Sequence, residues 1–336
     1  MNILITGGLG FIGGQFLTKI KDKNPFDQII VFDKMTYASN YSRVKGVFEK
    51  NNFLLVKGDV ANKDDVQDVF QTHKPNIIIN FAAESHVDNS IKNPDLFLEV
   101  NTKGTLNLLI EAKNLWIDQN NTLKDQYKKS IFYQISTDEV FGSLSSTNSF
   151  DEKSPYSPNS PYSASKAGAD HFVKAFHKTF NLPTIISYSS NNFGPYQNEE
   201  KLIPKIISCT QKNKAIPIYS DGSNIRDWIF VDDHCNAINL ILEKGKPGKE
   251  YCIGGSNEMS NLEICKLILE IIDTLIPCKK QKKYMDRIKF VKDRKGHDYR
   301  YALKTSKIFY DYKIFENSSF KENLKFTICH FLNLKK

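Results

Sequence analysis

The 336-residue sequence has few cysteines, few arginines and no long apolar run. Its six cysteines form no C-x-x-C pair, so neither a zinc site nor a disulfide framework is indicated. No uncharged apolar stretch reaches about 18 residues, and Met1 leads directly into an apolar strand, which leaves no room for a signal peptide. We therefore expect reduced thiols, no metal, no membrane segment and a cytoplasmic location.

The basic residues are distributed unevenly. The net charge is +8, but the lysines are spread along the chain without the aromatic residues that accompany them in a nucleic-acid platform. We expect no nucleic-acid partner; a non-catalytic nucleic-acid-binding protein would instead show steeply salt-dependent binding and no turnover. A guanidinium grips phosphate through two hydrogen bonds, so the arginines of the last third are candidates for a substrate phosphate site, with structural ion pairing equally open. They are Arg226, Arg287, Arg294 and Arg300.

A glycine-rich turn follows the first predicted strand. Residues 1–6 have the pattern of a buried strand, and Gly7, Gly10 and Gly13 follow it. Such glycines allow a tight turn and let the backbone approach a pyrophosphate at the N-terminus of the next helix. A second strand, 28–32, ends at Asp33, whose carboxylate suits the ribose hydroxyls and would repel a 2′-phosphate. The pattern predicts NAD, and Lys34 is the one residue that argues for NADP.

Strand-like and helical patterns alternate along the first 190 residues. They predict an α/β fold with a doubly wound parallel sheet of the Rossmann type, in which ligands bind beyond the carboxyl ends of the strands. The predicted strands are 53–56, 76–81, 131–136 and 184–188, and the predicted helices are 96–116 and 164–180, with a surface loop at 143–161.

The pattern becomes less regular from Gly194 onward, where we expect substrate recognition. We predict an NAD-binding domain at 1–190, to which 227–254 returns with short strands at 229–231 and 251–253. A smaller mixed α/β substrate-binding domain would comprise 191–226 and 255–336.

Two short motifs carry proton chemistry. Tyr162 and Lys166 stand four residues apart, so they share one face of a helix. The lysine charge can stabilise a phenolate, and lowering a tyrosine pKa by ~3 units takes roughly 4 kcal/mol. This spacing alone is more often an exposed helix start. Thr137, Asp138 and Glu139 add two adjacent carboxyls, whose pKa values a closed site can push apart to give one acid and one base.

At these motifs the chain resembles the dTDP-glucose 4,6-dehydratases of the extended short-chain dehydrogenase/reductase superfamily. The match runs from residue 1 to about residue 305. The stretches that carry it are 7–13, 33–38, 82–88, 136–140, 160–166, 190–195, 200–204, 225–228 and 293–298.

The resemblance implies a bound NAD that is reduced and reoxidised within one cycle. Tyr162, assisted by Lys166, would take the proton of the glucose 4-hydroxyl while C4 gives hydride to NAD. Glu139 would then remove the C5 proton, Asp138 would protonate the departing 6-hydroxyl, and hydride would return to C6. The product would be a 4-keto-6-deoxy sugar nucleotide, for rhamnose or another deoxysugar.

The resemblance also implies a set of binding residues. Thr137 would hydrogen-bond the 4-oxygen and Ser85 would contact the sugar, while His86 and His234 are expected to be structural. The cofactor site would comprise Gly7, Gly10, Phe11, Ile12, Gly13, Asp33, Lys34, Met35, Thr36, Asp59, Val60, Phe81, Ala82, Ala83, Glu84, Ser85, Tyr162, Lys166 and Asn192. The substrate site would comprise Ser85, Thr137, Asn191, Lys201, Leu202, Pro217, Ile218, Tyr219, Arg226, Asn261, Arg294 and His297. Family members commonly form homodimers through paired helices, here 96–116 and 164–180.

Four positions depart from the family pattern. Val100 stands where a threonine commonly touches the cofactor, Ser220 replaces a glycine, Lys295 a proline and Phe193 a tyrosine. UDP-glucose 4,6-dehydratases share most of the motifs, so uracil is an alternative base. Another NAD-dependent sugar-nucleotide enzyme, an epimerase or a decarboxylase, is the second alternative, although relatives that only epimerise lack the acid pair.

Overall fold

The structure is a computed structural model that describes residues 1–20, 27–50, 53–145, 147–278, 283–316 and 318–334. The chain divides into two compact units. Unit 1 comprises Met1–Val140, Ser160–Tyr188 and Cys235–Tyr251, and unit 2 comprises Phe141–Asn159, Ser189–His234 and Cys252–Lys336. The sequence pattern grouped 1–190 together, whereas the structure groups Phe141–Asn159 with unit 2 and returns a shorter segment than 227–254 to unit 1.

The strand order of the large sheet is that of a doubly wound fold. Among the described residues the sheet has seven strands, and β1 pairs in parallel with both β2 and β4. The pairs β2–β3 and β4–β5 are parallel too. The strands are almost continuously apolar because helices cover both faces of the sheet. Their order is β10 (Glu250–Ile253), β6 (Thr184–Ser189), β5 (Ile131–Thr137), β4 (Ile77–Asn80), β1 (Asn2–Thr6), β2 (Gln28–Asp33) and β3 (Phe53–Lys57).

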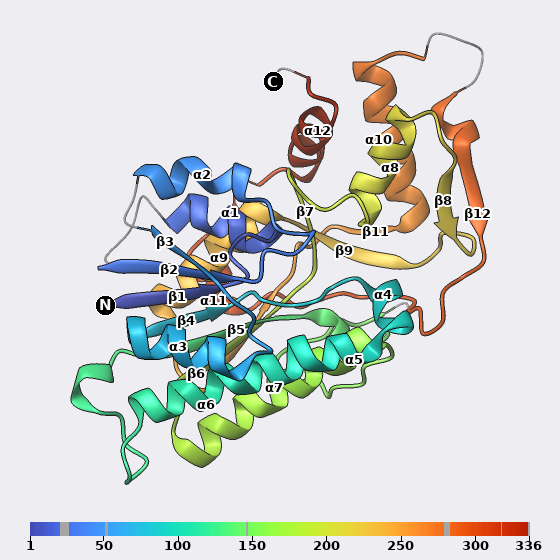
Figure 1. Cartoon of the computed structure of the whole chain (residues 1–336). Helices are drawn as coiled ribbons and strands as arrows, with labels where there is room; N and C mark the ends of the chain where they lie inside the picture. The colour runs from blue at the N-terminus through green and yellow to red at the C-terminus, as the bar shows by residue number, and fades with distance from the viewer. Residues whose placement is uncertain (21–26, 51–52, 146, 279–282, 317, 335–336) are drawn as a thin grey trace. The chain divides into compact units, whose positions relative to one another are not determined.

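Helices lie on both faces of this sheet (Figure 1). On one face are α1 (Phe11–Ile20), α2 (Tyr41–Lys50) and most of α9 (Val231–Lys244). On the other face are α3 (Lys63–His73), α6 (Gly104–Trp116) and α7 (Pro161–Phe180), together with α4 (Val87–Lys92) and α5 (Pro94–Phe97). Short 3-10 turns are η3 (Asp125–Tyr127) and η4 (Asp138–Phe141).

The predicted helix 96–116 is interrupted. Between α5 and α6 the chain forms a π-helical segment, η2 (Leu98–Lys103). Asn101 in η2 is buried, and its amide donates to the Glu84 carbonyl and the Ser165 hydroxyl. Hydrophobic periodicity does not reveal such a local change in hydrogen bonding, and π-bulges are frequent at functional sites. The predicted strand 229–231 was also wrong at its end, because β9 stops at Phe230 and Val231 begins α9.

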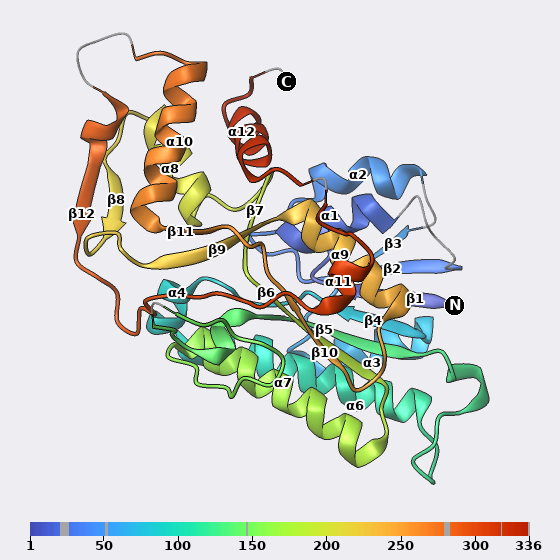
Figure 2. The ribbon, with the colours of Figure 1, turned by 180° about the vertical axis from the view of Figure 1, so that it is seen from behind.

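Unit 2 contains two small sheets among its described residues. In the first, β9 (Ile225–Phe230) pairs antiparallel with β11 (Glu258–Ser260) and parallel with β7 (Asn191–Phe193). In the second, β8 (Ile216–Tyr219) and β12 (Ile288–Val291) pair in parallel. Figure 2 shows α8 (Leu202–Gln211) and α10 (Asn261–Leu275) beside β8 and β12. The remaining elements are η5 (Tyr284–Arg287), α11 (Lys307–Asp311) and α12 (Phe320–Phe331).

Within the described ranges, no helix combines the length and apolar character needed to cross a bilayer. The same residues contain no group of three or more histidine, cysteine or acidic side chains that could hold a metal ion.

Candidate active site

The turn after β1 requires glycine at two of the predicted positions. Gly7 has φ +64°, and a Cβ there would lie 2.7 Å from the backbone of Ala82. A Cβ on Gly13 would lie 2.5 Å from the Gly7 carbonyl oxygen. These contacts let α1 begin directly after the turn and close to β1. The turn and the N-terminus of α1 are therefore shaped to receive a pyrophosphate.

Asp33 ties the end of β2 to this turn. Its buried carboxylate accepts hydrogen bonds from the Leu9 amide at 2.9 Å, the Met35 amide at 2.8 Å and the Ser39 hydroxyl at 2.9 Å. Lys34, the residue that argued for NADP, forms an ion pair with Asp59 at 2.7 Å. Because the Asp59 carboxylate offsets the Lys34 charge, this corner of unit 1 fits ribose hydroxyls better than a further phosphate.

The segment after β4, residues 81–85, is hydrogen-bonded to η2. The Phe81 amide donates to the Thr6 carbonyl, and the Glu84 amide donates to Asn101 Oδ1 at 2.9 Å. The Thr102 hydroxyl donates to the Ser165 carbonyl at 2.8 Å, which connects η2 to α7. Ser85, the predicted sugar contact, is exposed beyond this segment. Asn101 is a site-forming residue that the motifs did not reveal.

The acid pair lies at the carboxyl end of β5. Thr137 is the last residue of the strand, and Asp138 and Glu139 form the first turn of η4. Asp138 is buried, and its Oδ1 accepts a hydrogen bond from the Thr137 hydroxyl at 3.3 Å. The Glu139 amide donates to the same hydroxyl at 3.3 Å. Two neighbouring carboxyls therefore differ in exposure, since Glu139 is half-buried.

Tyr162 and Lys166 are both buried on the first turns of α7. The helix begins with Pro161 after Ser160, and the Ser160 and Ser163 side chains cap it reciprocally. The Tyr162 ring packs edge-to-face on Phe97, with 6.3 Å between ring centroids. Lys166 Nζ donates to the Ile135 carbonyl of β5 at 2.8 Å.

Protein charges alone do not favour a Tyr162 phenolate. Burial raises the pKa of Tyr162, and the carboxylate of Glu139 raises it further, while hydrogen bonding with Thr137 lowers it. Burial also lowers the pKa of Lys166. The sequence predicted that Lys166 would lower the pKa of Tyr162, and this lowering is not seen in the structure. Burial and the neighbouring carboxylates therefore outweigh the hydrogen bond with Thr137.

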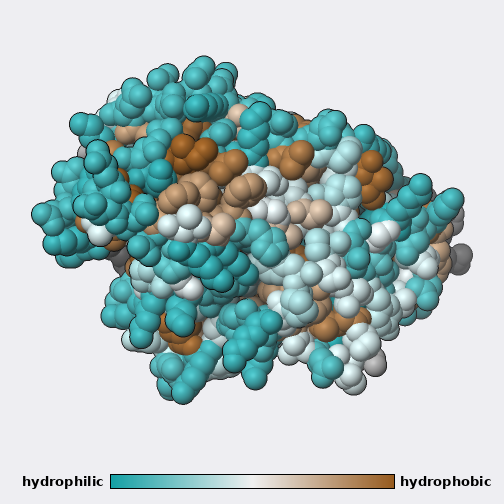
Figure 3. Space-filling view, turned by 90° about the horizontal axis from the view of Figure 1, so that it is seen from below, coloured by the Kyte–Doolittle hydropathy of each residue, from teal (hydrophilic) through white to brown (hydrophobic). Residues whose placement is uncertain are grey.

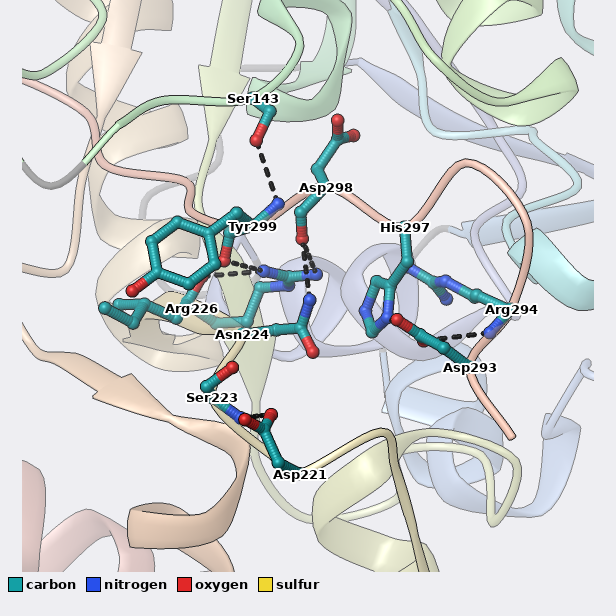
Figure 4. Close-up of polar contacts among 11 residues, drawn as sticks. Ser143, Asp221, Ser223, Asn224, Arg226, Asp293, Arg294, His297, Asp298 and Tyr299 are labelled. Carbon is teal, nitrogen blue, oxygen red and sulfur yellow. Dashed lines mark hydrogen bonds and ion pairs between the residues drawn. The ribbon is translucent and has the colours of Figure 1, made fainter. Parts of the chain in front are cut away.

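Unit 2 contains a cluster of predicted nucleotide ligands (Figure 4). Arg226 is buried on β9, and its guanidinium donates to the carbonyls of Asp298 at 3.0 Å and Tyr299 at 3.3 Å. The Asn224 amide donates to the same Asp298 carbonyl at 3.1 Å. These bonds fasten the segment 293–299 to β9.

His297 lies at the centre of this segment. Its Nδ1 lies 2.6 Å from Asp293 Oδ1, and its ring meets the Tyr219 ring edge-to-face with 5.9 Å between centroids. Burial lowers the pKa of His297 to about 4, and the charges of Arg294 and Arg226 lower it further. Two guanidiniums, Arg294 and Arg226, therefore act on a neutral His297 ring, which also contacts the Asp293 carboxylate.

The other predicted substrate residues lie at the ends of unit 2 elements. Lys201 and Leu202 begin α8, and Asn261 begins α10. Pro217 and Tyr219 face away from the core on β8, whereas Ile218 is fully buried, so its side chain faces the core. Asn191 opens β7.

Asn192 has a structural environment. Its amide donates to the Ser189 hydroxyl and the Ser190 carbonyl, and its Oδ1 lies 2.8 Å from Nδ1 of the fully buried His234. His86 caps α4 by accepting from the Asn89 amide. Both histidines thus have structural contacts, as expected.

Two of the four candidate arginines also have structural contacts. Arg300 forms a bidentate ion pair with Glu258 at 2.6 and 2.9 Å and donates to the Ser145 and Asn148 carbonyls. Arg287 donates to the Thr210 carbonyl and covers the Tyr284 ring. Structural pairing, the alternative left open by the sequence, applies to both.

Comparison with known proteins decides the family. The family model described as GDP-mannose 4,6 dehydratase matches residues 4–325. A dTDP-glucose 4,6-dehydratase of Haemophilus influenzae is 44% identical over 335 residues, covering 99% of this chain and 98% of that protein. The chain belongs to the dTDP-glucose 4,6-dehydratase family. A family member from Escherichia coli K12 is 41% identical and covers 92% of this chain and 86% of that protein.

Solved structures agree with this assignment. A Streptomyces venezuelae dTDP-glucose 4,6-dehydratase, solved with NAD bound, superposes with a TM-score of 0.89 at 36% identity, covering 99% of this chain and 97% of that one. A UDP-glucose 4-epimerase of Thermus thermophilus has a TM-score of 0.83 at 23% identity, which shows the shared fold alone. The Rossmann-type prediction is confirmed.

Proposed function

We propose that this chain removes water from dTDP-glucose to give a dTDP-4-keto-6-deoxy sugar, with NAD as a resident cofactor. The observation that carries the proposal is the burial of Tyr162 and Lys166 beside Thr137, Asp138 and Glu139, in the same unit as the glycine turn. An epimerase needs the tyrosine and lysine, but elimination of water also needs a separate acid and base.

The residues divide the proton transfers among them. Tyr162 removes the proton of the 4-hydroxyl, with the Thr137 hydroxyl hydrogen-bonding the same oxygen. Glu139 removes the C5 proton, which the 4-ketone has made acidic, and later returns a proton to C5. Asp138, the more buried carboxyl, protonates the departing 6-hydroxyl.

The residues of unit 1 fit NAD. The turn at Gly7 and Gly13 cannot hold a Cβ, Asp33 lies beside it, and the Asp59 carboxylate neutralises Lys34. When bound, NAD would supply the hydride transfer between C4 and C6, and the positive charge of its oxidised ring would favour a Tyr162 phenolate. Tyr162, Lys166 and the segment 81–85 would hold its nicotinamide end.

The residues of unit 2 would bind the nucleotide diphosphate. Arg226 and Arg294 supply positive charge, the neutral His297 ring supplies a hydrogen-bonding group, and Tyr219 supplies a flat ring beside it. Asn191, Lys201, Leu202, Asn261 and the chain at 217–218 complete the proposed contacts. The names of the relatives favour dTDP over UDP as the nucleotide.

We also propose a homodimer built on the α6 and α7 face. Figure 3 shows the face that carries the helices drawn lowest in Figure 1, with apolar areas among hydrophilic ones. The side chains of Leu98 in η2 and Phe172 in α7 are exposed to 55% and 39%. A second copy would cover such groups. A cytoplasmic location is supported by the six cysteines, which form no disulfide and five of which are buried.

The function is tested by supplying purified protein with dTDP-glucose, and separately with UDP-glucose, in deuterated water. NMR should show a 4-keto-6-deoxy product carrying deuterium at C5, formed faster from dTDP-glucose, with no net change of NAD. Epimerised sugar without C5 deuterium would support the epimerase alternative, and inactivity with both sugars would refute the proposal.

A further inference from the structure

Asp170 is a buried carboxyl group that none of the proton transfers above uses. It is fully buried on α7, one helical turn after Lys166 and two after Tyr162, so all three share a face. Its Oδ2 accepts a hydrogen bond from the Ser136 hydroxyl at 2.5 Å.

Two neighbouring residues of β5 form hydrogen bonds with two successive turns of α7. Lys166 Nζ donates to the Ile135 carbonyl at 2.8 Å, and Ser136 donates to Asp170. Thr137 and the acid pair follow Ser136 directly. The contacts therefore set the position of the Tyr162 helix relative to the strand end that carries the acid pair.

The charges around Asp170 alternate in sign. Lys166 and Lys174 flank it on α7, and Lys174 forms an ion pair at 2.9 Å with Glu250 of β10, which also accepts from Tyr188 of β6 at 2.5 Å. Asp138 and Glu139 act on Tyr162 from the end of β5. A buried ammonium loses its proton unless an anion stabilises it. The acid pair changes charge during the proposed cycle, whereas Asp170 keeps its charge.

We propose that Asp170 is a positioning residue for the reaction: its carboxylate keeps Lys166 protonated and, through Ser136, fixes α7 against the end of β5. The proposal rests on the proposed function, because the charge of Lys166 matters to catalysis when Tyr162 takes the 4-hydroxyl proton. Burial lowers the pKa of Lys166 and the Asp170 charge raises it. Burial raises the pKa of Asp170 itself to about 6, so the carboxyl is mostly ionised at neutral pH.

The test is the pH profile of kcat in Asp170→Asn, which keeps the shape and removes the charge. The high-pH limb, set by Lys166, should move down by about one pH unit, so that kcat falls about tenfold above it and changes little below it. The low-pH limb should also move slightly down, because the Asp170 charge raises the pKa of Tyr162. Ultraviolet titration of the phenol, with the Tyr162→Phe signal subtracted, measures the downward shift of the Tyr162 pKa without turnover.

Ser136→Ala is the matched control, because it removes the hydrogen bond and leaves the Asp170 charge. Its high-pH limb should stay where the wild-type limb lies, whatever the size of kcat. If Asp170→Asn lowered kcat by the same factor at every pH, or if Ser136→Ala moved the high-pH limb equally, the proposal would be overturned.

A stability cycle tests the charge coupling between Lys166 and Asp170 without activity. Lys166→Met should remove one of the positive charges that stabilise the buried Asp170 carboxylate, and Asp170→Asn should remove the negative charge that stabilises the buried Lys166 ammonium, so each lowers Tm. The double variant should be at least as stable as Asp170→Asn, since both charges are gone. Strictly additive losses would refute the coupling. The cycle measures this coupling even if the wild-type protein fails to turn over dTDP-glucose. Failure of the proposed function and failure of the proposed role of Asp170 can therefore be distinguished.

Discussion

The two charged regions of this chain are built in opposite ways. In unit 1 charges of opposite sign alternate along α7, from the buried Lys166 and Asp170 to the half-exposed Lys174. In unit 2 two guanidiniums, Arg294 and Arg226, both lower the pKa of His297, while its hydrogen bond with Asp293 raises it. A neighbouring charge of opposite sign stabilises the ionised form of each group, whereas several positive charges together attract an anion. The difference is consistent with the proposed function, in which unit 1 does the proton chemistry and unit 2 binds the diphosphate.

The largest effect on activity is expected from removing the Tyr162 hydroxyl in unit 1. We expect Tyr162→Phe to lower kcat by roughly 10³-fold with little change in fold, because the ring still packs on Phe97 while the proton acceptor is lost. Product formation and circular dichroism measure the two effects. Tyr133→Phe is the matched control, since Tyr133 is as buried and its hydroxyl bonds Ser187. Equal losses in both variants would contradict the assignment.

A change in unit 2 should act on binding instead. Arg226→Lys loses the planar fork and should raise KM about 10- to 100-fold while kcat changes less than about threefold. Steady-state kinetics with dTDP-glucose measures both constants. Arg300→Lys should lower stability and leave KM near the wild-type value, because Arg300 pairs with Glu258. If Arg226→Lys lowered kcat and left KM unchanged, the assignment of binding to unit 2 and chemistry to unit 1 would be contradicted.

The buried histidine of unit 2 predicts an acid-sensitive stability. Burial lowers the pKa of His234 from 6.5 to about 3, so the unfolded chain binds a proton more readily than the folded one. This contribution is complete above pH 6.5 and is lost as pH falls through 6.5 toward 3, by roughly 2 kcal/mol at pH 5. Urea unfolding at pH 7.5 and pH 5 should show a smaller loss in His234→Gln than in wild type. An equal loss in both would count against burial as the cause.

The smallest effect is expected at Ser220. This residue, which directly follows β8, has φ 51°, a conformation that glycine adopts readily. A side chain in the left-handed region costs about 1 kcal/mol, and glycine regains part of that while making the unfolded chain more flexible. Ser220→Gly should therefore stabilise the protein by about 0.5 kcal/mol and leave KM unchanged. A lower midpoint in urea would show that Ser220 makes a contact worth more than the strain.

The parallel sheet and the glycine turn could be predicted because their causes are local. An apolar strand followed by Gly7, Gly10 and Gly13 allows few other structures, and the same holds for Asp33 after β2. Tyr162 and Lys166 could be placed on one helix face by their spacing, and the structure shows both on α7.

Features that depend on distant contacts could not be predicted. The π-helical turn at Asn101 exists because its side chain reaches Glu84 and Ser165, which lie far away in sequence. The direction of the Tyr162 pKa shift depends on burial and on Glu139, which spacing does not report. Phe193, in place of a tyrosine, packs in an aromatic cluster with Phe230 and Phe320, where no hydroxyl is needed.

The position of solvent deuterium tests the central claim, that a second acid–base pair eliminates water, most directly. Wild-type protein given dTDP-glucose in deuterated water should yield product with one deuterium at C5. Glu139→Gln should lose about 10²-fold or more of that product while the sugar keeps its C5 proton. Product that carries ordinary hydrogen at C5, or exchange at C5 that persists in Glu139→Gln, would contradict the account.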